Sequence, residues 1–148
     1  MKKSLFILFS VLLSYSISAQ KLRIFGEVQQ EINLDAQTLS KYPSSNFEIK
    51  DKDQSKTYNA VGVYELFKAA GVTLGNQLRG ESLSKYVVAK ASDGYEVVFA
   101  LTEFDPEFTD SPILIAPNEG TFRLIVPKEK RRARWIRELA SLEIKFSK

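Results

Sequence analysis

The sequence predicts one α+β domain, rich in strands and with short helices. Several short runs either alternate apolar and polar side chains or are continuously apolar, as half-buried and fully buried strands are. Residues 63–70 instead place apolar side chains at helical spacing. The dipeptide Asp93-Gly94 separates two β-rich runs, which is typical of a tight hairpin. We therefore expect a mixed sheet accompanied by a few short helices.

The first elements follow from alternation and capping residues. Residues 21–28 have strand character, and residues 46–50 alternate as a half-buried strand does. Between them, Asn33 is placed to cap a short helix over residues 34–40, which Pro43 ends. A charged turn is expected next, followed by an extended segment that Thr57 opens.

The clearest helix signal lies in the middle of the chain. Val63, Leu66, Phe67 and Ala70 share one face at helical spacing, and Gly71 stands where a left-handed residue ends a helix. After it we predict a short helical turn at residues 102–105, capped by Thr102. The remaining segments are predicted as strands, at residues 86–91, 95–101, 113–116, 122–126 and 142–146.

The N-terminal segment 1–19 has the pattern of a secretory signal peptide. Two lysines precede an apolar run at residues 5–13, and a small-residue stretch ends at Ala19. We predict cleavage after Ala19 and an exported domain of residues 20–148, periplasmic or secreted. The run is too short to span a bilayer as a membrane anchor, which is the alternative interpretation. No second long apolar segment follows it, so we expect no membrane span after cleavage. No twin-arginine pair precedes it, which indicates the general secretory route.

Composition excludes several kinds of chemistry. The chain of 148 residues contains no cysteine and no histidine. Disulfides, zinc sites built on these residues, catalytic cysteines and histidine bases are therefore excluded, and we predict no metal site. Without the signal segment, basic and acidic residues nearly balance, so we expect no nucleic-acid partner.

A basic run at residues 128–137 follows Pro127 and is the first candidate binding feature. Arg131, Arg132 and Arg134 have the chemistry to converge on phosphate, sulfate or carboxylate, and Trp135 to stack on a ring or an arginine. The alternative is a solvated charged loop with Trp135 anchored in the core. The sequence leaves both interpretations open.

Two further features concern charges near strands. Arg123 lies within an apolar strand, where it either needs a partner or points to solvent, and the alternation does not decide between these. An acidic set does not match the spacing of a calcium loop, so we expect these side chains to be solvated. The set comprises Glu103, Asp105, Glu107 and Asp110.

Taken in order, several segments resemble the molybdopterin-binding domain of the sulfite oxidase family of oxidoreductases. The matching stretches lie at residues 62–67, 70–72, 92–95, 113–116, 122–127 and 134–136. The resemblance implies the sulfite-oxidase-type fold, with a pterin pyrophosphate in a basic groove and molybdenum held by a dithiolene and a cysteine. It also implies the anion-binding residues, which would be Asn118, Arg123, Arg131, Arg132 and Arg134.

The chain departs from the family in three respects. The spacing of the family places its cysteine near Lys50 and Asp51, neither of which replaces a soft thiolate. The segment between Ala116 and Phe122 is shorter than in the family. Exported members that carry the cofactor usually have a twin-arginine signal, which this chain lacks.

These observations lead to one main hypothesis and two alternatives. The main hypothesis is an exported protein that binds molybdopterin or another anionic ligand in a basic groove without molybdenum–thiolate catalysis. The first alternative is a non-catalytic module that docks an acidic protein partner. The second is an active periplasmic oxidoreductase with an unusual metal ligand. The sequence assigns no catalytic residue, and it leaves open whether the protein is an enzyme.

Overall fold

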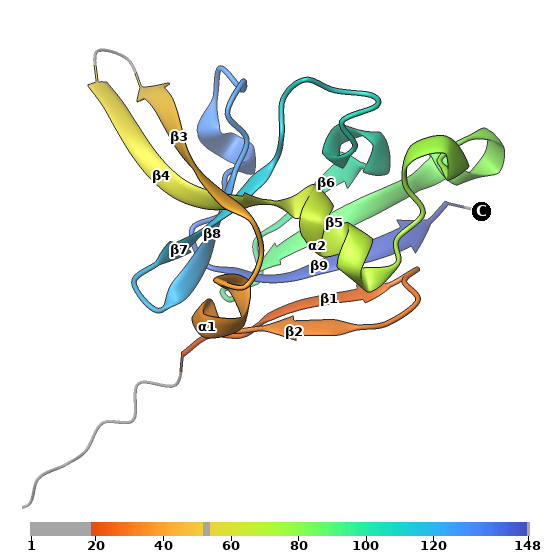
Figure 1. Cartoon of the computed structure of the whole chain (residues 1–148), viewed down its shortest axis with the longest axis horizontal. Helices are drawn as coiled ribbons and strands as arrows, with labels where there is room; N and C mark the ends of the chain where they lie inside the picture. Colours follow the sequence, from red (N-terminus) through yellow and green to blue (C-terminus); the bar gives the residue numbers. More distant parts are fainter. Residues whose placement is uncertain (1–18, 52–53, 148) are drawn as a thin grey trace, which may run out of the picture.

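Two β-sheets form the framework of the part that the computed structural model describes, residues 19–51 and 54–147 (Figure 1). The five-stranded sheet has the order β2-β1-β9-β5-β6. Its strands are β1 (Leu22–Gly26), β2 (Ile32–Leu34), β5 (Lys85–Ala91), β6 (Glu96–Ala100) and β9 (Leu139–Phe146). Strands β1 and β9 are parallel, whereas the other neighbours are antiparallel, so the sheet is mixed.

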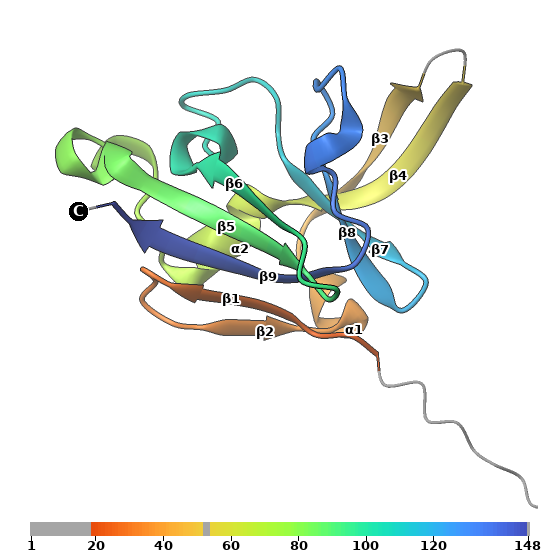
Figure 2. The ribbon, with the colours of Figure 1, turned by 180° about the vertical axis from the view of Figure 1, so that it is seen from behind.

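The four-stranded sheet has the order β3-β4-β7-β8 and is antiparallel. Its strands are β3 (Ser44–Asp51), β4 (Gln54–Gly62), β7 (Leu114–Asn118) and β8 (Thr121–Ile125). In Figures 1 and 2 the β3–β4 hairpin extends away from the body of the molecule. The predicted α+β, strand-rich class is confirmed, with the strands divided between two sheets.

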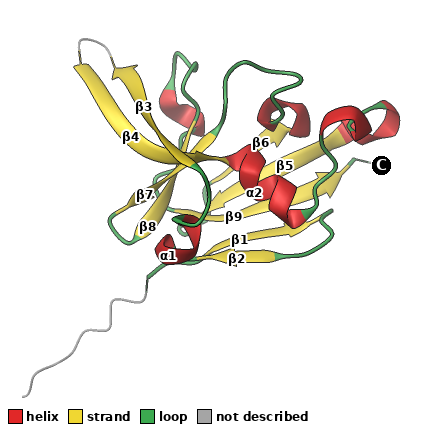
Figure 3. Ribbon diagram, viewed as in Figure 1, coloured by secondary structure: helices red, strands yellow, loops and turns green. Residues whose placement is uncertain are grey.

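The helical elements are short (Figure 3). They are α1 (Ala36–Leu39), α2 (Val63–Ala70) and the 3-10 turns η1 (Gly75–Gln77), η2 (Gly80–Ser84), η3 (Leu101–Phe104) and η4 (Arg132–Arg134). Helix α2 has the predicted bounds, and its four predicted apolar residues are buried. Gly71 follows it with a φ of 69°, a left-handed conformation that glycine adopts without strain.

The first predicted helix begins later than expected, and Asn33 does not cap it. Asn33 pairs with Arg23 in the ladder between β1 and β2, which commits it to a strand. Asp35 is the cap, because its Oδ1 accepts a hydrogen bond from Thr38 N at 2.7 Å. This bond from the backbone of Thr38 lowers the pKa of Asp35 below its ordinary value.

Other predicted boundaries also shift. The charged turn expected around residues 51–56 is mostly strand, since β4 begins at Gln54; residues 52–53 lie outside the described residues. The helical turn η3 is present, but Thr102 lies within it and is not its cap. Instead, Glu103 Oε1 accepts a hydrogen bond from Ala100 N at 3.0 Å. Strand β2 and the turns η1 and η2 were not predicted.

The predicted signal segment lies outside the described residues, apart from Ala19. The fold begins directly after it, where Gln20 N donates a hydrogen bond to Gly120 O at 3.1 Å. The side-chain amide of Gln20 also donates to Leu139 O at 3.1 Å. In the part of the chain that the structure describes, no helix is long and apolar enough to cross a membrane.

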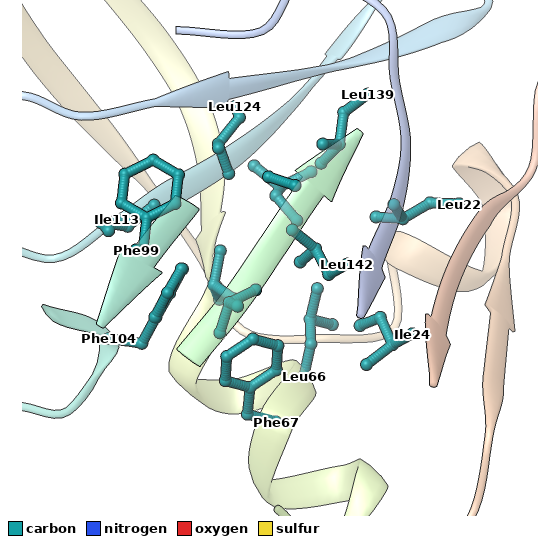
Figure 4. Close-up of a cluster of buried hydrophobic side chains, with 14 of the residues drawn as sticks. Leu22, Ile24, Leu66, Phe67, Phe99, Phe104, Ile113, Leu124, Leu139 and Leu142 are labelled. Carbon is teal, nitrogen blue, oxygen red and sulfur yellow. The ribbon is translucent and has the colours of Figure 1, made fainter. Parts of the chain in front are cut away.

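The main hydrophobic core joins both sheets to α2 (Figure 4). Phe67 of α2 meets Phe104 with ring centroids 5.0 Å apart, and Phe104 meets Phe99 of β6 at 5.5 Å. Leu124 contributes to this core from β8 and Leu142 from β9. The ring contacts fix the turn η3 against the end of β6, and η3 contributes to one wall of the pocket described below.

A second, smaller cluster covers the other face of the four-stranded sheet. It consists of Ile49, Tyr58, Ala60, Leu114, Ala116 and Ile125. Trp135 packs against both clusters, its indole nitrogen donates to Val126 O at 3.0 Å, and its ring lies edge-on to Tyr58. The segment after β8 is therefore anchored over this sheet by one aromatic side chain.

The expectation that the acidic set is solvated is wrong for Asp105, which is fully buried. Its Oδ2 accepts a hydrogen bond from Gly75 N at 2.6 Å, and its Oδ1 accepts one from Glu107 N at 2.9 Å. Its backbone carbonyl accepts from the nitrogens of Phe108 and Thr109. Asp105 thus connects the turn η1 to the loop after η3 and shapes that loop.

We expect Asp105→Ala to lower the free energy of unfolding by about 2–3 kcal/mol, because Gly75 N and Glu107 N lose the acceptor that the buried Asp105 carboxyl provides. Urea unfolding followed by circular dichroism measures this. Asp110→Ala is the matched control, since Asp110 is exposed and close in sequence. Equal unfolding midpoints for the two variants would show that Asp105 does not organise the loop.

Candidate functional site

A pocket of about 440 Å³ opens between the loop after η3 and the loop after β8. Its apolar base is formed by Ile113 and Val126, which are both buried. The hydroxyl groups of Thr102, Thr109 and Ser111 line one side. This volume lies in the range of small-molecule sites, which combine apolar surface with a few polar groups.

One wall of the pocket carries an exposed aromatic ring. Phe108 lines the pocket and retains 48% of its surface exposed. Its backbone nitrogen and that of Thr109 are held by Asp105 O, so the buried carboxyl residue positions this wall. The ring is available to pack against an apolar or planar part of a ligand.

Arg134 bridges the two walls of the pocket. Its Nε donates to Glu129 Oε1 at 2.5 Å, and its Nη2 also contacts that oxygen. Its Nη1 donates to Glu103 Oε2 at 3.0 Å, and its guanidinium lies 4.4 Å from the centre of the Phe99 ring. Since Glu103 also holds Ala100 N, the bridge ties the loop after β8 to the start of η3.

The bridge keeps Arg134 charged. Burial by itself lowers the pKa of Arg134, but the hydrogen bonds and charges of Glu129 and Glu103 outweigh this effect and raise its pKa above the ordinary value. Two carboxylates face one guanidinium, so the three groups together carry one net negative charge. Lys128, which also lines the pocket, brings the charged groups of its lining to neutrality.

The segment of residues 127–134, here called the basic loop, carries five basic side chains and one acidic one. Lys128, Lys130 and Arg131 are exposed, and none makes a hydrogen bond or ion pair with the described part of the chain. Arg132 lies over the Trp135 ring, 4.5 Å from its centre. Lys128, Lys130 and Arg131 thus agree with the interpretation as a solvated loop, and Trp135 is anchored and stacks on an arginine, while anion binding by the arginines stays a prediction.

Asn118 and Arg123 meet at the turn between β7 and β8. Arg123 Nη2 donates to Asn118 Oδ1 at 3.2 Å, and Asn118 Nδ2 donates to Arg137 O at 3.3 Å. Arg123 lies opposite Ala116 in the ladder and is half-buried, so it points neither fully to solvent nor into the main core. Its Nε is buried without a hydrogen-bond partner among the described residues.

The five predicted anion-binding residues therefore occupy three places. Arg134 lines the pocket, Arg131 and Arg132 lie elsewhere on the basic loop, and Asn118 with Arg123 lies at the hairpin turn. They do not share one cavity, because the basic loop leaves the end of β8 opposite the turn at which Asn118 and Arg123 meet.

Sequence reasoning missed the two glutamates that hold Arg134. Glu129 stands inside the basic run, and its spacing from Arg134 offers a weak signal of pairing. Glu103 and Arg134 are 31 positions apart, and nothing in the sequence connects them. The hydroxyl residues and Phe108 were missed for the same reason, since only the packing of two loops brings them together.

The donor set does not fit a molybdenum centre held by the protein. The chain has no cysteine, and the described residues contain no group of three or more acidic side chains that could hold a metal ion. In the pocket, Arg134 is already engaged by the carboxylates of Glu103 and Glu129. Lys128 is the lining cation that has no partner within the described residues.

Comparison with known proteins adds no assignment. No protein-family model matches the sequence, and no curated protein matches it significantly. The chemistry of the pocket and of the basic loop therefore carries the functional argument.

We expect Arg134→Gln to lower the free energy of unfolding by about 1–2 kcal/mol, because Glu103 and Glu129 then face each other without a cation and all three groups are partly exposed. The loss should shrink in 1 M salt, which screens the repulsion. Chemical unfolding at low and high salt measures both effects.

Arg23→Gln serves as the control, because its ion pair with Glu31 is half exposed on both sides. This variant should stay within about 0.5 kcal/mol of the wild type. A loss for Arg134→Gln no larger than that of Arg23→Gln would contradict a bridging role.

Proposed function

We propose that this protein is an exported, non-catalytic binding protein that takes an anionic ligand in the pocket beside the basic loop. The observation that carries the proposal is the presence of three cations without partners at one locus, namely Lys128, Lys130 and Arg131. Residues 128–137 contain six basic side chains and one acidic one, although the predicted mature chain is nearly neutral. Such a local excess attracts anions without making the whole protein basic.

The pocket complements this charge with other recognition groups. Lys128 supplies a flexible ammonium group at the pocket, and three hydroxyl groups supply further donors. The apolar base and the exposed Phe108 ring fit an apolar or planar part of a ligand. A ligand with a compact anionic group and a planar body would use both kinds of surface.

The proposal of binding without catalysis rests on the hydrogen bonds that the two glutamates of the pocket make with Arg134. Glu129 Oε1 and both carboxylate oxygens of Glu103 accept hydrogen bonds from Arg134, so these three oxygens already hold the bridge. A general base needs a free lone pair within reach of the proton that it removes. The N-terminal segment, which has the pattern of a signal peptide, supports export.

Molybdopterin remains one candidate ligand, supported by the resemblance of the sequence to the sulfite oxidase family. Its pyrophosphate has the required charge and its pterin is planar. Protein purified from its native host decides this point by the amounts of molybdenum and released pterin per chain. Pterin without molybdenum would agree with the proposal, whereas near-equal amounts of both would favour an enzyme.

For the general proposal, inorganic pyrophosphate is the probe, and Trp135 is the reporter because it is the only tryptophan. We expect pyrophosphate to change Trp135 fluorescence saturably and Lys128→Gln to weaken binding about tenfold, through loss of a charge-assisted contact. Lys41→Gln, after α1 at the opposite end of the molecule (Figure 1), is the matched control and should bind as the wild type does. Equal affinities of both variants would place the ligand elsewhere.

Docking of an acidic protein is a second candidate, favoured because Lys130 and Arg131 are exposed on the basic loop but do not line the pocket. Polyglutamate is a suitable probe. If this candidate is correct, the double variant Lys130→Gln/Arg131→Gln should lose polyglutamate binding while Lys128→Gln retains most of it. The reverse order of effects would favour the pocket.

A further inference from the structure

The two glutamates use different edges of the Arg134 guanidinium. Glu129 occupies the edge formed by Nε and Nη2, while Glu103 takes Nη1. The Nε–Nη2 edge is one of the two-donor forks with which arginine binds carboxylate or phosphate groups. Glu129 therefore stands where the oxyanion of a ligand would bind.

The two carboxylates also differ in burial and in their second roles. The Glu129 side chain is 19% exposed, against 37% for Glu103. Glu103 has a second partner in Ala100 N, whereas no second partner is found for the Glu129 carboxylate in the described residues. Glu129 N donates to Val126 O at 3.2 Å, which holds the backbone of the loop independently of the side chain. A rotation of the Glu129 side chain would therefore release the fork without moving the loop.

We propose that Glu129 is a built-in competitor for the anion site, so that the pocket takes doubly charged phosphate-type groups and excludes carboxylates. This inference rests on the proposed function, because it concerns the same pocket. Phosphate-type dianions are the ligand class that the pocket selects, and Glu129 is the residue that makes the selection.

The selection follows from the exchange that binding requires. A ligand carboxylate that displaces Glu129 replaces one carboxylate–guanidinium contact by an equivalent one. It gains nothing in contact energy, and it competes with a group whose effective concentration is millimolar or higher because it is tethered. A phosphate-type dianion carries more charge to the same fork, and Lys128 is free to bind its remaining oxygens. Only the second exchange is favourable.

The experiment compares Glu129→Gln with the wild type, using inorganic pyrophosphate and acetate as probes. Glutamine keeps the length and one acceptor oxygen of the side chain, so the loop retains its packing. We expect Glu129→Gln to bind pyrophosphate about tenfold more tightly and to gain measurable acetate binding, which the wild type lacks. Titration calorimetry measures both affinities, and an unchanged Trp135 spectrum verifies the loop.

Glu107→Gln is the matched control. Glu107 is exposed on the loop after η3 and does not contact Arg134, so the variant loses the same charge near the pocket without freeing the fork. Its affinity for pyrophosphate should change less than about twofold, since exposed charges are strongly screened. An equal gain in both variants would reduce the effect to general electrostatics and overturn the inference.

The remaining outcomes separate this inference from the proposed function. If the wild type binds pyrophosphate and Glu129→Gln binds it equally or more weakly, the competitor role is wrong while the proposed function stands. If only Glu129→Gln binds, Glu129 closes the fork to both kinds of anion in the wild type, so both the selection of phosphate-type groups and pyrophosphate binding by the wild type are overturned. If neither binds, both proposals fail.

Discussion

The four-stranded sheet has to be covered on both faces, and the rest of the structure depends on how this is done. Consecutive residues of β8 point into different clusters, with Leu124 in the main core and Ile125 in the second one. The segment after β8 covers the second cluster by laying Trp135 over it. Because Trp135 is fixed to Val126 O and packs on Tyr58, the basic loop before it is held at both ends. The position of the candidate site is thus a consequence of apolar burial.

The spacing of apolar residues and the local turn residues predicted those elements whose bounds tertiary contacts do not change. Helix α2 was predicted with its bounds, since its apolar stripe and Gly71 are local signals. The β5–β6 hairpin followed equally well from Asp93-Gly94, and Gly94 has the positive φ that such a turn requires. Strand β2 was missed because three residues carry too little pattern, and its pairing with β1 moved the helix cap from Asn33 to Asp35. The division of the strands into two sheets depends on long-range pairing, which no local pattern contains.

The candidate site was predictable only where chemistry is concentrated in the sequence. The basic run marked the correct loop, but it did not distinguish Arg134, which is held by two acids, from Lys128 and Arg131, which are not. Asp105 appeared to be one exposed acid among several, yet it is the acid that is buried and that orders a wall of the pocket. In both cases an important partner lies about 30 positions away in the sequence, namely Gly75 for Asp105 and Glu103 for Arg134. Whether a charged side chain is paired or solvated therefore depends on the fold.

The central position of β9 has a consequence for how the chain acquires its structure. The last strand of the sequence lies between β1 and β5 (Figure 2), and it provides hydrogen-bond partners to both. The larger sheet therefore cannot close until β9 is in place, and this closure joins strands that lie far apart in the sequence, which slows folding. Until β9 pairs, one hydrogen-bonding edge of β1 and one of β5 lack their strand neighbour. The larger sheet is thereby expected to form in one cooperative step that includes β9.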